Sequence, residues 1–177
     1  MITPSELLVI MPQSGTRAAI YAGPLSQAMD EFQINVPRRI AAFLATIAEE
    51  SWELQYVKEV TDGHLYEPPS KIAQELGNTQ PGDGAKYIGR GLGQATGRWM
   101  YGALQKSLNL PLIDRPELLE EIEPACRSAA WIWQSKKLNA MADGDQFGAC
   151  CYRWNGGYNG LDARIGYWLR ARTVLGL

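Results

Sequence analysis

Histidine and cysteine are scarce in this sequence, and their scarcity excludes several kinds of active site. The 177 residues include one histidine, His64, so a metal site built from several histidines is excluded. His64 lies in a turn-like stretch, and we expect a solvated loop residue rather than the base of a nucleophile pair. The cysteines Cys126, Cys150 and Cys151 fit neither a disulfide framework nor a zinc spacing, so we expect reduced core residues. Carboxylates, amides, hydroxyls and arginines are left to carry any chemistry.

The sequence also lacks an excess of charge, a long apolar run and an internal repeat. Seventeen Lys and Arg residues oppose nineteen Asp and Glu residues, for a net charge of −2, so nucleic acid is not expected as a partner. No apolar run approaches the roughly 18 residues of a membrane span, and we expect no membrane insertion. Residues 1–11 lack the pattern of a signal peptide, which predicts synthesis in the cytoplasm. The length and the 46% hydrophobic content predict one globular domain over residues 1–177. We expect a monomer, although no residue pattern determines the oligomeric state.

Helix signals dominate the chain. Valine and isoleucine are sparse and alternating polar–apolar runs are nearly absent, which predicts a mainly α fold with at most a small β element. The most regular apolar spacing follows Pro37, where Ile40, Phe43, Leu44 and Ile47 predict one face of a buried helix. Other segments with helix signals are residues 3–11, 24–32, 97–108, 116–122, 124–137, 144–154 and 161–175. Residues 61–91 are rich in Gly, Pro, Asn and Asp instead, and we expect this long loop to form a wall of a site.

Three carboxylates lie at the end of the helix that follows Pro37. If its apolar stripe faces the core, Glu50 and Glu53 continue near that stripe while Glu49 points away. An apolar environment disfavours the charged form of a carboxylate, which suits a general acid. The ordinary alternative is that these are charges on the solvated end of an amphipathic helix.

A second carboxylate, Glu59, follows Glu50 by nine residues. In an unbroken helix this spacing gives about 13.5 Å of rise and places the two side chains on opposite faces. Glycosidases that invert configuration hold their two carboxyl groups about 6.5 to 9.5 Å apart, with a water between them. Cooperation of Glu50 with Glu59 therefore requires the helix to end or bend before Glu59, and Glu67 is the alternative partner.

Two further segments offer polar groups among glycines. Residues 87–98 place Gln94 and Thr96 on one side if the segment is extended, and their glycines fit a tight turn beside a polar groove better than a dinucleotide loop. Residues 154–160 place Asn155 between aromatic residues and glycines, as in a sugar site or in an ordinary turn. Arg164 could bind an anion or pair with Asp162.

Four segments in this order carry a resemblance to a known family. Residues 43–51, 76–84, 89–98 and 155–167 resemble glycoside hydrolase family 19, in particular its phage and prophage endolysin branch, and the similarity extends over residues 1–177. The resemblance implies a lysozyme-like helical domain with a deep cleft, no separate wall-binding module, and hydrolysis of a β-1,4 bond between amino sugars with inversion. Glu50 resembles the general acid, Glu59 the second acid that activates water, and Thr96 the hydroxyl that holds this water.

The resemblance also implies a set of binding residues. Gln94, Tyr101 and Asn155 match positions that contact substrate, and Arg164 matches an arginine that supports the catalytic carboxylates. No cofactor and no metal are implied. The chain departs from the family pattern at Glu49, where a histidine is usual, at Trp52 and Glu53, where two glycines are usual, and at Met100, where an asparagine is usual.

The substrate implied by the endolysin-type motifs is peptidoglycan. We therefore expect a lysozyme-type enzyme that accumulates in the cytoplasm and acts on cell-wall glycan strands in the periplasm after its release. Two alternatives stay open at this point, a chitinase and a catalytically impaired module that only binds glycan.

Overall fold

The computed structural model describes all residues, Met1–Leu177, and consists of ten α-helices, three short 3₁₀ helices and isolated β-bridges. It divides into two compact units, which are described one at a time. The first unit contains Met1–Tyr56 and Ala130–Leu177, and the second contains Val57–Ala129. Because this division concerns local compactness, the expected single domain over residues 1–177 stays a prediction. No helix is both long and apolar enough to cross a lipid bilayer.

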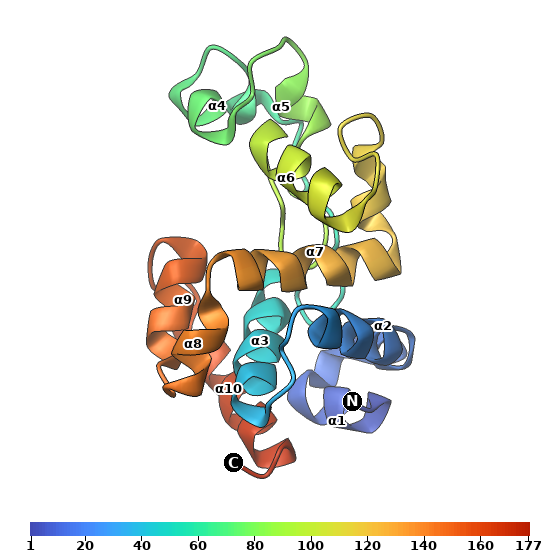
Figure 1. The fold of residues 1–177 in the computed structure, drawn as a ribbon, viewed down its shortest axis with the longest axis vertical. Helices are drawn as coiled ribbons and strands as arrows, with labels where there is room; N and C mark the ends of the chain where they lie inside the picture. The colour runs from blue at the N-terminus through green and yellow to red at the C-terminus, as the bar shows by residue number, and fades with distance from the viewer. The chain divides into compact units, whose positions relative to one another are not determined.

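The first unit is built around α3 (Figure 1). Its elements are α1 (Pro4–Ile10), η1 (Pro12–Ser14), α2 (Arg17–Glu31), α3 (Pro37–Glu50), the last part of α7 (Ile122–Ser135), α8 (Leu138–Asp143), α9 (Phe147–Asn155) and α10 (Leu161–Val174). The apolar spacing after Pro37 makes α3 a buried helix, and every residue from Ala41 to Ala48 is buried. Helix α10 packs along α3, and α1 packs against both α2 and α10. This packing fixes the end of α3, where the candidate acid lies.

Aromatic side chains fill the core of the first unit. Phe43 of α3 meets Trp133 edge to face, with ring centroids 5.7 Å apart. Phe147 and Trp168 stack with centroids 5.0 Å apart, which joins α9 to α10. Cys150 and Cys151 of this unit, and Cys126 of the second unit, are buried and form no disulfide, as expected.

The second unit is a loop-rich region that carries several short helices. Its elements are η2 (His64–Tyr66), α4 (Lys71–Leu76), α5 (Asp83–Lys86), α6 (Arg98–Leu108), η3 (Pro116–Glu120) and the first part of α7. Asp83 is buried and accepts hydrogen bonds from the backbone N–H groups of Thr79 and Gln80, at 2.9 and 3.0 Å, and from Arg98 Nε at 2.8 Å. These bonds tie the loop of residues 77–86 to the start of α6. His64 is exposed in this unit, as expected.

Most of the expected helices are present, and the differences have local causes. Helix α2 begins at Arg17 rather than near Pro24, because one interior proline removes a single helical hydrogen bond while the helix buries residues on both sides of it. Residues 116–120 form a 3₁₀ helix, and α8 was not expected. Residues 61–91 are not one open loop, since they contain η2, α4 and α5.

Candidate active site

Glu50 ends α3 and is held by Arg164 of α10. The Arg164 Nη2 group donates a hydrogen bond to Glu50 Oε1 and forms an ion pair with it. The side chains of Glu50 and Arg164 are 15% and 3% exposed, so the pair is shielded from water. Arg164 Nη1 also donates to the carbonyl oxygen of Thr46 at 3.1 Å, one turn before Glu50. Arg164 therefore binds the carboxylate and its helix together, and Asp162 is not its main contact. Its expected role in supporting a catalytic carboxylate stays a prediction.

A second cation, Lys136, lies near Glu50. Its Nζ donates to the carbonyl oxygens of Trp154 and Arg153, at 2.6 and 3.4 Å, and lies 5.6 Å from the centroid of the Trp154 ring. Burial lowers the pKa of Lys136, and the negative charge of Glu50 opposes this shift. Sequence reasoning missed Lys136, because a lysine next to another lysine at a helix end carries no motif.

The loop after α3 turns sharply and buries a third carboxylate. Trp52, Glu53 and Leu54 all have left-handed backbone conformations, with φ of 49°, 55° and 67°. The helix therefore ends at Glu50, as cooperation between Glu50 and Glu59 requires. Glu53 is buried as expected, but this loop buries it, whereas the expected continuation of the helix stripe does not exist.

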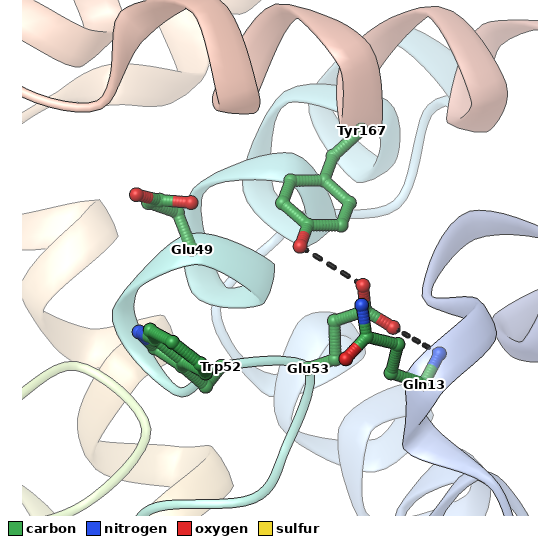
Figure 2. A pocket seen from close by; sticks show the side chains of 5 residues that line it. All are labelled: Gln13, Glu49, Trp52, Glu53 and Tyr167. Carbon is green, nitrogen blue, oxygen red and sulfur yellow. Dashed lines mark hydrogen bonds between the residues drawn. The ribbon is translucent and has the colours of Figure 1, made fainter.

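Glu53 connects the loop to two other elements (Figure 2). Its Oε1 accepts a hydrogen bond from the Tyr167 hydroxyl at 2.9 Å, and its Oε2 accepts one from the backbone N–H of Gln13. Burial, together with the hydrogen bond and charge of Glu53, raises the pKa of Tyr167 to about 12. These residues line a pocket of about 250 Å³ together with Trp52 and Glu49. Glu49 was expected to point away from the core, and it is half-buried in this pocket instead.

Asn155 is the last residue of α9 and is exposed. Its Nδ2 group donates to the carbonyl oxygen of Asn159 at 3.3 Å, which closes the turn that leads to α10. Its side-chain oxygen makes no hydrogen bond within the protein. Asn155 therefore stabilises the turn through its Nδ2 group, and its Oδ1 atom is free to accept a hydrogen bond from a ligand.

In the second unit, Glu59 lies in the extended stretch after the loop. Its Oε1 accepts from the Tyr66 hydroxyl at 2.7 Å, and its Oε2 accepts from the backbone N–H of Gly89 at 3.0 Å. Burial and the bond to Glu59 raise the pKa of Tyr66 to about 12. Glu67, the alternative partner, accepts from the backbone N–H groups of Gly82 and Gly84, the latter at 2.8 Å. Glu67 thus holds a glycine turn, whereas Glu59 lies beside the segment that contains Gln94 and Thr96.

Gly89 brings Gln94 close to Glu59. A β-carbon at Gly89 would lie 2.7 Å from Gln94 Oε1 and 3.1 Å from Glu59 Oε2, so only glycine leaves room for both side chains. The Thr96 hydroxyl donates to the carbonyl oxygen of Gln94 at 3.0 Å.

Residues 90–95 form a tight turn rather than an extended segment. Arg90 and Ala95 exchange backbone hydrogen bonds of 3.1 and 2.8 Å, and Gly91 and Gln94 have φ of 76° and 52°. The expected alignment of Gln94 with Thr96 along an extended segment is therefore wrong, although the turn keeps the two residues together.

Tyr101 is fully buried on α6. Its hydroxyl donates to the Ile88 carbonyl oxygen at 2.7 Å and accepts from Arg90 Nη1 at 3.0 Å. Burial raises the pKa of Tyr101 to about 12, against the effect of Arg90. The expected substrate contact does not fit this placement, because no atom of the side chain is exposed and its hydroxyl is already bonded. Tyr101 supports the turn that begins at Arg90.

The predicted site residues thus form two groups. Glu50, Asn155 and Arg164 lie in the first unit, while Glu59, Gln94, Thr96 and Tyr101 lie in the second. Within these groups the structure pairs Glu50 with Arg164 and places Gln94 next to both Glu59 and Thr96. No group of three or more His, Cys, Asp and Glu side chains has the arrangement of a metal site.

Known proteins similar to this chain are mostly chitinases. An endochitinase from Arabidopsis thaliana is 33% identical over 171 residues, which cover 92% of this chain and 56% of the relative. A glycosyl hydrolase family 19 domain-containing protein from Haemophilus influenzae is 36% identical over 94 residues, 52% of this chain and 45% of the relative. The crystal structure of chitinase C from Streptomyces griseus has a TM-score of 0.77 and 23% identity, covering 99% of this chain and 76% of that one. No family profile matches the chain.

The chain has the fold of glycoside hydrolase family 19 and is homologous to its chitinases. This confirms the expected mainly α, lysozyme-like fold with almost no strand. The chain spans 50 to 65% of the length of the three Arabidopsis endochitinases that it matches. The family 19 relatives named here are chitinases or carry no substrate in their name, so the endolysin branch gains no support from them.

Proposed function

We propose that this protein hydrolyses β-1,4 bonds in a polymer of N-acetylglucosamine, with inversion of configuration. The observation that carries the proposal is the shielded Glu50–Arg164 pair at the end of α3, in a chain homologous to family 19 chitinases. The motifs alone favour peptidoglycan, whereas the similar proteins support the chitinase alternative better. We therefore propose chitin as the substrate class, and we treat peptidoglycan as the alternative substrate that the experiments must distinguish from it.

In the proposed reaction, each carboxylate has one task. Glu50 in its protonated form donates a proton to the leaving glycosidic oxygen, and Arg164 fixes the direction of its carboxyl group. Ionised Glu59, oriented by Tyr66, takes a proton from the water that attacks the opposite face of the sugar. Thr96 holds that water, and Gln94 and Asn155 bind the sugar chain. No cofactor takes part in this scheme.

The decisive experiment compares wild-type protein with Glu50→Gln on the hexamer of N-acetylglucosamine. We expect wild type to release shorter oligomers whose new reducing ends are first α-anomers in proton NMR, because inversion converts a β linkage to an α product. Glu50→Gln should lose about a thousandfold or more in turnover, since it has no proton to donate. Glu75→Gln, which removes an exposed carboxylate on α4, serves as the matched control. A Glu50→Gln variant at wild-type rate would contradict the assignment of the acid.

Peptidoglycan is tested in parallel on Gram-negative cells with permeabilised outer membranes. Rapid lysis and release of reducing-end muropeptides, together with no turnover of the hexamer, would favour the lysozyme-type reading and its periplasmic site of action. If the protein binds one of the two polymers but cleaves neither, a glycan-binding module would be favoured.

A further inference from the structure

The pocket at the end of α3 contains groups that the proposed reaction does not use. We call it the α3-end pocket; it has a volume of about 250 Å³ and is lined by Gln13, Glu49, Trp52, Glu53 and Tyr167. These residues belong to η1, α3, the loop after α3 and α10, all in the first unit. Glu49 directly precedes the candidate acid Glu50. The pocket therefore lies at the same end of α3 as that acid.

Glu53 gives the pocket a fixed wall. Glu53 is 5% exposed. Its Oε1 accepts a hydrogen bond from the Tyr167 hydroxyl, and its Oε2 accepts one from the backbone N–H of Gln13. These bonds hold the left-handed loop that contains Trp52. Trp52 is 69% exposed, and the centroid of its ring lies 6.3 Å from that of Tyr56 in an edge-to-face arrangement. The loop thus presents an aromatic surface at the mouth of the pocket.

Glu49 supplies a free acceptor in the same place. Its carboxylate forms no hydrogen bond or ion pair with another part of the protein. A β-carbon at Gly160 would lie 2.7 Å from Glu49 Oε1, so the glycine at the start of α10 leaves the space that this carboxylate occupies. In Figure 2, Glu49 and Trp52 lie in the left part of the view, and the hydrogen bonds that Glu53 accepts from Tyr167 and from the backbone of Gln13 lie to their right.

The chemistry of these groups selects a ligand class. An ionised carboxylate accepts hydrogen bonds and does not donate them. It therefore binds an ammonium group more strongly than it binds a neutral amide group. The face of an indole ring packs against the apolar face of a pyranose. The lactyl carboxylate of muramic acid would meet like charge here. We propose that the α3-end pocket is a subsite for a deacetylated glucosamine unit, whose free ammonium group binds Glu49 while its ring packs on Trp52.

This inference rests on the proposed function, because it assumes an amino-sugar polymer as substrate. It extends that function to partly deacetylated chitin. The test measures kcat/KM on two hexamers, the fully acetylated one and one that carries glucosamine units, and takes the ratio of the two values. We expect Glu49→Gln to lower the ratio of deacetylated to acetylated substrate about tenfold, the effect of losing a charge-assisted hydrogen bond. Glu121→Gln, the same change at an exposed position of the second unit, should leave the ratio as it is.

Two further measurements address the same pocket. The wild-type ratio should fall as sodium chloride rises from about 0.05 to about 0.5 M, because salt screens a partly exposed ion pair, whereas the ratio of Glu49→Gln should change little. Trp52→Ala should weaken the binding of both hexamers about tenfold, since both have the pyranose face that packs on the ring. Near-ultraviolet circular dichroism of each variant shows whether the fold is kept.

The outcomes separate this inference from the proposed function. If wild type cleaves the acetylated hexamer and Glu49→Gln has the wild-type ratio, the subsite is wrong and the hydrolase stands. If wild type cleaves neither hexamer, the proposed function fails, and calorimetric titration with the glucosamine hexamer tests the pocket alone. Binding that is about tenfold weaker in Glu49→Gln would then support the subsite, and equal binding would overturn it.

Discussion

Arg164 binds Glu50 across 114 residues of sequence, and the same guanidinium group reaches the Thr46 carbonyl one helical turn earlier. The pair joins the end of α3 to the beginning of α10, where the candidate acid must be held still. An ion pair with so little exposure contributes in two ways, since it orients a catalytic carboxylate and connects two helices of the core. These two contributions can be separated by substitution.

Arg164→Met should destabilise the fold and lower turnover together. Removing one partner of a buried pair leaves the other charge without compensation, which costs about 3 kcal/mol or more in the free energy of unfolding. Glu50→Gln also leaves a buried charge, that of Arg164, without its partner, but the amide oxygen can still accept the Arg164 hydrogen bond, so we expect a smaller loss of stability and a larger loss of turnover. Urea denaturation and the hexamer assay measure both quantities. If Arg164→Met kept wild-type stability, the pair would not have the structural role assigned to it.

Stability at acidic pH should depend on Asp83. Burial raises the pKa of this carboxyl, but hydrogen bonds from Arg98 and from the backbone of Gln80 and Thr79 outweigh burial and lower it. A lowered pKa in the folded state means that the stabilisation is present above the unfolded-state pKa of about 3.9 and is lost as the pH falls through the folded value. We expect urea midpoints to fall below about pH 4 in wild type.

The matched variant for this pH dependence is Asp83→Asn. It should be less stable than wild type at pH 7 and should lose less on acidification, so that the two stability curves converge at low pH. Parallel curves from pH 7 to pH 3 would show that Asp83 is not the group responsible.

The positions of most helices along the chain could be predicted from the sequence, because the signals that begin, end and orient a helix are local. The apolar spacing from Ile40 to Ile47 fixes the buried face of α3, and Pro37 marks its start. The end of the helix at Glu50 was a requirement of the chemistry, and the structure meets it with three left-handed residues that no propensity scale would assign to Trp, Glu and Leu. Contacts with Tyr167 and Gln13 stabilise that loop, and they are tertiary.

Motif positions predicted some contacts among the candidate site residues and missed others, and the catalytic roles of these residues stay predictions. Glu50 and Arg164 meet as the family resemblance implies. Tyr101 occupies a motif position too, yet its buried hydroxyl already donates a hydrogen bond to the Ile88 carbonyl oxygen and accepts one from Arg90. Lys136 approaches Glu50 from the end of a helix with no motif at all. Burial and long-range pairing decide these roles, and a single sequence does not encode them in any local pattern.

The buried thiols should resist alkylation while the protein is folded. Burial raises the pKa of Cys150 to about 12 and that of Cys151 to about 11, and it raises the pKa of Cys126 as well. Because the thiolate is the reactive form, iodoacetamide at pH 8 should label none of the three in the native state and all three in urea. Rapid labelling of the native protein at any one cysteine, read by mass spectrometry, would contradict its burial.

Gly97 in the second unit, compared with Gly156 in the first, tests how much the start of α6 depends on close backbone contact. Gly97 has φ 87° and ψ 151°, a region that essentially only glycine adopts, whereas Gly156 has φ 73° and ψ 12°, in the left-handed helical region, so alanine is strained at each by about 1 to 3 kcal/mol. At Gly97 a β-carbon would also lie 2.6 Å from the carbonyl oxygen of Leu76, and a backbone atom cannot move aside as a flexible side chain can. At Gly156 a β-carbon would meet nothing within 4 Å.

Gly156→Ala is therefore the control in which alanine meets left-handed backbone strain with no steric overlap. We expect Gly97→Ala to lose at least about 2 kcal/mol more than Gly156→Ala, because the chain must separate α4 from the start of α6 to relieve the overlap. Urea denaturation of both variants under the same conditions gives the difference directly. Equal losses would contradict both the overlap with Leu76 and the extra backbone strain assigned to alanine at Gly97.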